Sequence, residues 1–156
     1  MNKGLKNALS IILSVFGVIT MITPAFRAVN CEATGRVFKY SLYLRIFGGG
    51  NPKIGNTGPL TLAWILSLVA LITSLVLVIL NLINYEISKK TNLITYGVMM
   101  VLYAVGGTLV IFTPQLIGIT YNATLGIGSI LTSCFMYAGF IMSLVFVLFY
   151  FLKKED

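Results

Sequence analysis

The sequence has no histidine and only four acidic residues in a chain of 156. Histidine and carboxylates carry out most of the proton transfers in enzymes, so a chain this poor in both is badly equipped for acid–base catalysis. The four acidic residues, Glu32, Glu86, Glu155 and Asp156, lie in three separate segments and form no pair. We therefore expect no catalytic residues, and a protein that is not an enzyme.

Charged residues of either sign are also scarce, at 10% of the chain. A soluble domain carries about 25%, so this composition excludes an ordinary soluble globule. Cysteine is limited to two residues, which without histidine make a poor metal site. The sequence therefore predicts no bound metal and no cofactor.

Apolar residues are abundant, at 58% of the chain. A helix that crosses the hydrocarbon core of a membrane needs roughly 20 mainly apolar residues. Four runs reach this length, at residues 5–23, 60–81, 93–112 and 127–151. Proline lies beside three of their ends, where a helix tolerates it. The sequence predicts an all-α membrane protein, a four-helix transmembrane bundle that forms a single domain over residues 1–156.

Basic residues indicate which side of the membrane each loop occupies. One side has six lysines close to the apolar runs: Lys3, Lys6, Lys89, Lys90, Lys153 and Lys154. The other side has five basic residues, all in the first loop: Arg27, Arg36, Lys39, Arg45 and Lys53. The positive-inside rule counts basic residues near the spans in short loops, which favours the first set. We expect both termini in the cytoplasm and the first loop, residues 25–59, outside.

The first loop contains the pattern of a β-strand. From Phe38 to Ile46, apolar residues occupy the even positions, and the odd positions are mostly polar. This period of two is typical of a half-buried strand, and we expect its partner from residues 29–35 or 53–57. One interpretation is a small β element that contacts a partner through Lys39, Tyr43 and Arg45. The other is a lid on the helix ends whose polar face is merely solvated.

Small and polar residues recur on one face of the second and fourth runs. These residues are Ala63, Ser67, Ala70, Ser74, Asn81, Ser129, Gly139 and Ser143. Helices in lipid associate through small residues and hydrogen bonds, so we interpret the two stripes as the interior of the bundle. The alternative is a polar pore or ligand seam. Packing is favoured, because conduction usually leaves an ionisable group at depth and these two runs contain none.

The two cysteines, Cys31 and Cys134, both lie toward the outer side in this orientation. A disulfide between them is geometrically possible, and two independent thiols are the alternative. Residues 122–124 match a glycosylation acceptor on the same side. The chain is rich in isoleucine and asparagine, which is typical of an AT-rich bacterial genome, so we attribute the match to chance. We expect the protein in a bacterial plasma membrane.

The order of one helix, an outer loop with a strand and three further helices resembles the claudin-like tetraspan plan in topology. Claudins carry a Trp-Gly-Leu-Trp motif and paired cysteines in this loop. Here the single tryptophan is Trp64 and the loop has one cysteine, so the barrier role of claudins is not implied. The sequence is also similar to small four-span proteins of low-GC Gram-positive bacteria and mollicutes in residues 46–49 and 123–130. That resemblance implies no particular activity.

These observations favour a non-enzymatic function. The leading hypothesis is a membrane scaffold, or an accessory subunit of a membrane complex, that binds a protein or envelope component through the first outer loop. The alternative is a transporter or channel component that uses the polar seam between the second and fourth spans. The expected partners are the lipid bilayer and either another protein or a second copy of the chain, with no role for nucleic acid.

Overall fold

The computed structural model describes residues 3–33, 36–41, 58–83, 85–112, 114–115 and 122–152. Four long helices account for most of them: α1 (Lys3–Ile22), α3 (Gly58–Leu82), α4 (Lys89–Ile111) and α6 (Ile127–Leu152). All four are long and apolar enough to cross a membrane. The prediction of four long apolar helices is confirmed.

Local signals set the helix ends. Ser88 is the N-cap of α4, and its Oγ accepts a hydrogen bond of 3.1 Å from the backbone N–H of Thr91. Such a cap satisfies one of the open N–H groups of the first turn, so α4 begins at Lys89. Lysine lowers the mean hydropathy of a segment, so the apolar run identified in the sequence starts at residue 93, four residues after the start of α4. After α1, Pro24 lies in the short 3-10 helix η1 (Thr23–Ala25), which leads to the first strand.

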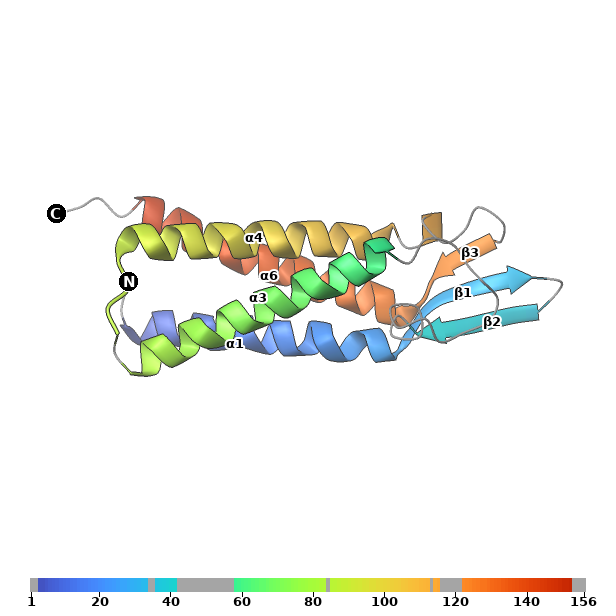
Figure 1. Ribbon diagram of the computed structural model, residues 1–156, viewed down its shortest axis with the longest axis horizontal. Helices are drawn as coiled ribbons and strands as arrows, with labels where there is room; N and C mark the ends of the chain where they lie inside the picture. The colour runs from blue at the N-terminus through green and yellow to red at the C-terminus, as the bar shows by residue number, and fades with distance from the viewer. Residues whose placement is uncertain are drawn as a thin grey trace.

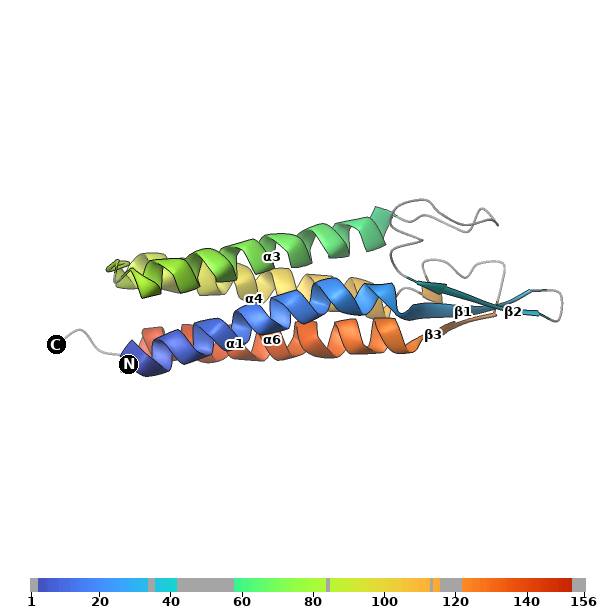
Figure 2. The same ribbon diagram turned by 90° about the horizontal axis from the view of Figure 1, so that it is seen from below.

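The four helices form one elongated antiparallel bundle (Figures 1 and 2). α1 and α4 each pack against both α3 and α6, so α1 and α4 are diagonal to each other, as are α3 and α6. At one end of the bundle α1 begins, α3 connects to α4, and α6 ends (Figure 1). We call this the lysine end, for Lys6, Lys89 and Lys90. A β-sheet projects from the opposite end, which we call the sheet end (Figure 1).

The sheet has three strands in the order β2-β1-β3: β1 (Arg27–Ala33), β2 (Arg36–Ser41) and β3 (Asn122–Leu125). Both strand pairs are antiparallel. β2 overlaps the strand expected at 38–46, of which residues 42–46 lie outside the described residues, and β1 overlaps the expected partner segment 29–35. β3 comes from a segment for which we predicted no strand, because four residues are too few to show a period of two.

The interior of the bundle contains large apolar side chains, which include Leu13, Met99, Tyr103 and Phe146, each at most 1% exposed. Many other large apolar side chains lie on the outer surface, among them Val15 of α1 and Ile72 of α3, which are about half exposed. A soluble monomer rarely exposes so much contiguous apolar surface. This distribution fits helices whose outer faces contact lipid.

Glycine allows two of the helix pairs to approach closely. A Cβ atom on Gly17 of α1 would lie 2.9 Å from Leu71 Cδ1 and 3.2 Å from Leu71 Cα of α3. A Cβ atom on Gly139 of α6 would lie 3.0 Å from three ring atoms of Tyr103 of α4. Optimal carbon–carbon contacts are about 3.5–4.0 Å, so neither interface has room for a larger residue.

Candidate functional site

The eight residues of the predicted seam all lie inside the bundle. They are Ala63, Ser67, Ala70, Ser74 and Asn81 on α3, and Ser129, Gly139 and Ser143 on α6. They do not form a seam between two adjacent helices, because α3 and α6 are diagonal to each other. A hydrogen bond of 3.8 Å from Ser67 Oγ to Met136 Sδ reaches across this diagonal. The interior is therefore a four-helix core, to which α1 and α4 also contribute buried residues.

Sequence reasoning missed the polar residues that α1 and α4 add to this core. Ser10, Ser14 and Thr20 of α1 and Asn92 of α4 are all buried. The α1 signal was present, because Ser10, Ser14, Gly17 and Thr20 recur at spacings of four and three, as the stripe of α3 does. These spacings place residues on one face of a helix.

A hydrogen-bonded cluster joins three helices near the lysine end. Asn81 Nδ2 of α3 donates to Ser10 Oγ of α1 at 3.2 Å, and Ser10 Oγ lies 3.2 Å from the hydroxyl oxygen of Tyr96 in α4. The Tyr96 ring stacks on Phe146 of α6, with the ring centroids 4.0 Å apart and the planes 5° from parallel. Each of the four helices therefore contributes one side chain to this cluster.

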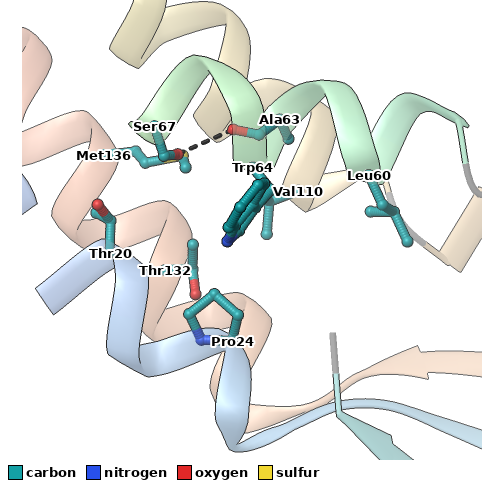
Figure 3. Close-up of a pocket in the computed structure, with 9 residues that line it drawn as sticks. All are labelled: Thr20, Pro24, Leu60, Ala63, Trp64, Ser67, Val110, Thr132 and Met136. Atoms are coloured by element: carbon teal, nitrogen blue, oxygen red, sulfur yellow. Dashed lines mark hydrogen bonds between the residues drawn. The ribbon is translucent and has the colours of Figure 1, made fainter. Parts of the chain in front are cut away.

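A second polar contact lies near the sheet end. The hydroxyl oxygens of Thr23 and Thr132 are 2.7 Å apart, which ties the end of α1 to the start of α6. Beside them is a small cavity of about 10 Å³, into which Trp64 of α3 points from above (Figure 3). A cavity of that size holds at most one water molecule. The cavity is lined by Thr20, Pro24, Leu60, Ala63, Trp64, Ser67, Val110, Thr132 and Met136.

The buried polar residues of the described interior are serines, threonines and asparagines. Several hydroxyls donate to carbonyl oxygens of their own helix, as Ser67 Oγ does to Ala63 (2.9 Å) and Ser74 Oγ to Leu71 (2.8 Å). Tyr103 contributes a buried hydroxyl that has no hydrogen-bond partner among the described residues. In the same part of the chain, no group of three histidine, cysteine or acidic residues could hold a metal ion.

The strand register divides the sheet into two faces, because residues paired across antiparallel strands lie on the same face. The first row of one face runs across β2, β1 and β3 as Lys39, Asn30 and Thr124. The next row of that face is Val37, Glu32 and Asn122. We call these six residues the polar face. The opposite face, which we call the apolar face, has the rows Tyr40, Val29 and Leu125, then Phe38, Cys31 and Ala123, and ends with the pair of Arg36 and Ala33.

Of the three predicted contact residues, Lys39 lies in the first row of the polar face. Tyr43 and Arg45 lie outside the described residues. Thr124, in the same row as Lys39, is exposed, whereas Leu125 on the apolar face is partly buried. Sequence reasoning missed the contribution of β3, although Asn122 and Thr124 had been noted as a glycosylation acceptor, because nothing in the sequence pairs residue 124 with residue 30.

The structure does not contain the disulfide considered between Cys31 and Cys134, because Cys134 is a free thiol on an exposed face of α6. Cys31 pairs with Ala123 in the sheet, before α6 begins at Ile127. Cys134 lies further along α6 by about 10 Å, at 1.5 Å per residue. A disulfide requires Cα atoms about 4.4–6.8 Å apart, so this axial offset alone keeps the two residues apart.

Comparisons with known proteins assign no family to this chain. No family model matches the sequence, and no similar curated protein or solved structure was found. The resemblance to small four-span bacterial proteins and the claudin-like topology both stay predictions. The geometry of the bundle and the sheet is therefore the basis on which a function is proposed.

Proposed function

We propose that this chain is a non-enzymatic scaffold, or an accessory subunit of a membrane complex, that binds a protein or envelope component through the polar face of its sheet. The observation that supports this proposal most directly is the two-faced sheet that projects beyond the helix ends (Figures 1 and 2). A surface that stands clear of the bundle is accessible to a partner outside the membrane. Five of the six residues of the polar face are polar or charged in type, and Thr124 among them is exposed.

The attachment of the sheet to the helices favours a platform over a loose lid. Only Phe26 separates η1 from β1, and only Gly126 separates β3 from α6. The backbone carbonyl of Gly126 accepts a hydrogen bond of 3.2 Å from the N–H of Ile130, so it forms part of the first turn of α6. The central strand β1 also packs against α6. Sites placed on such rigid elements hold their geometry better than sites on long loops.

In this proposal the sheet lies outside a bacterial plasma membrane and both termini lie in the cytoplasm. The support is the set of lysines at the lysine end, which flank the spans in short segments as the positive-inside rule expects. The partners are then the bilayer around the bundle and a protein or envelope component at the sheet.

The transporter or channel alternative has less support. Fully buried aromatic side chains occupy the core, and the cavity near Thr132 has room for about one water molecule. Permeation would require these side chains to move apart, at the cost of close contacts such as the one between Gly139 and Tyr103. A packed core of this kind is what a structural membrane subunit needs.

Removal of the first row of the polar face tests the proposal. In a Lys39→Ala, Asn30→Ala, Thr124→Ala variant, we expect the amount of partner crosslinked to the chain in intact cells to fall about tenfold, because one residue that dominates an interface contributes about 2 kcal/mol. A second variant, Tyr43→Ala with Arg45→Ala, tests the two predicted contacts outside the described residues. Quantitative mass spectrometry of the crosslinked, purified complex measures both effects.

The matched control replaces an exposed charged residue at the lysine end, Glu86→Ala. We expect this control to keep its full set of crosslinked partners, and circular dichroism to show that all variants remain helical. If both sheet variants retain the partners as well as the control does, the sheet is not the contact surface and the proposal fails.

A further inference from the structure

The lysine end gathers basic residues from distant parts of the sequence. Lys6 lies in the first turns of α1, and Lys89 and Lys90 are the first two residues of α4. The fold brings these helix starts to the same end of the bundle (Figures 1 and 2). Among the described residues of this end, Glu86 is the single acidic one.

An apolar rim surrounds the same end. The five most exposed large apolar side chains of the described residues are Leu152, Phe151, Leu82, Ile83 and Tyr85, all between 62% and 75% exposed. These residues lie at the last turns of α3 and α6 or just after α3, and both helices end at the lysine end (Figure 1). Exposed apolar groups beside ammonium groups match the two parts of a phospholipid, its acyl chains and its phosphate.

Helix length brings the lysines to the level of the headgroups. α4, which begins with Lys89 and Lys90, has 23 residues. At 1.5 Å per residue it spans about 35 Å, which exceeds a hydrocarbon core of about 30 Å. The bundle ends therefore extend into the headgroup layer, where lysine ammonium groups meet lipid phosphates.

From this arrangement we propose that the lysine end is a binding surface for anionic phospholipid of the phosphatidylglycerol class. The ammonium groups of Lys89 and Lys90 on α4 bind the lipid phosphate, Lys6 on the diagonal helix α1 adds positive charge to the same end, and the apolar rim contacts the acyl chains. This proposal does not depend on the function proposed for the sheet, because it concerns the opposite end of the molecule.

The test measures the preference of the protein for spin-labelled phosphatidylglycerol over spin-labelled phosphatidylcholine, after reconstitution in phosphatidylcholine vesicles. We expect a clear preference in the unmodified protein and a loss of roughly tenfold or more in the Lys89→Gln, Lys90→Gln variant, from the typical contribution of a lysine near an anionic surface. The matched control, Arg36→Gln with Lys39→Gln, removes the same charge from the sheet, and we expect it to keep the preference. Higher salt, which shortens the Debye length from about 10 Å at 0.1 M to about 3 Å at 1 M, should weaken the preference.

Two results would overturn this proposal. One is an equal loss of preference in the lysine variant and the sheet control, or a loss in neither. The other is displacement of the labelled lipid by soluble glycerol phosphate, since that would show binding of a free phosphate without any contribution from the apolar rim.

Discussion

Replacement of Gly17 by leucine is expected to lower the free energy of unfolding by about 2–3 kcal/mol, which is typical of overpacking at a tight interface. Any side chain at this position places a Cβ atom 2.9 Å from Leu71 Cδ1 and 3.2 Å from the backbone Cα of Leu71. The side-chain atom can rotate away, but the Cα atom can retreat only if α3 moves. The measurement is equilibrium unfolding in detergent micelles, followed by circular dichroism.

The control for this prediction is Gly97→Leu on α4. A Cβ atom on Gly97 has no neighbour within 4 Å, so a side chain there begins in open space and not against another helix. We expect this variant to be as stable as the unmodified protein or more stable, by up to about 1 kcal/mol from the better helix propensity. Equal destabilisation by both substitutions would show that α1 and α3 do not pack as described.

Replacement of Ser10 by alanine is the second change with a large expected effect. Ser10 Oγ is the common partner of Asn81 Nδ2 and the Tyr96 hydroxyl, and all three residues are buried. Loss of this oxygen leaves two buried polar groups without that partner, which we expect to cost about 1–2 kcal/mol of unfolding free energy. The same micelle assay measures it.

A matched hydroxyl on the outer side of the bundle gives the comparison. Thr73 Oγ1 donates only to the carbonyl oxygen of Val69 in its own helix, at 2.8 Å. Thr73→Ala should change the unfolding free energy by less than about 0.5 kcal/mol. In a double-mutant cycle, Ser10→Ala should cost less in a Tyr96→Phe background, and strictly additive effects would argue against the cluster.

The helices and their inward faces could be predicted because apolar length and helical spacing are local signals in a sequence. Apolar length identified the four long helices, and the small and polar stripe from Ala63 to Asn81 lies on the buried face of α3. Which helices face each other depends on how four such faces pack together, and a single stripe does not encode it. That is why Ser67 and Ser143 share a core without belonging to adjacent helices.

The sheet was only partly predictable for a different reason. The alternation that begins at Phe38 is a local signal, and it indicates a strand in the region of β2 without any knowledge of its partners. The pairing of Asn30 with Thr124 joins residues that are far apart in the sequence. Such a pairing is set by the position of α6 beside α1, so it could be found only from the fold.

The most direct test of the account is the accessibility of single cysteines to a membrane-impermeant maleimide in intact cells. In a background with Cys31→Ser and Cys134→Ser, the variants Thr124→Cys and Lys90→Cys report on the sheet end and the lysine end. The account predicts that the Thr124→Cys protein is labelled in intact cells and that the Lys90→Cys protein is labelled only after permeabilisation. Labelling of the Lys90→Cys protein alone in intact cells would contradict it, because the sheet and its partner would then lie in the cytoplasm.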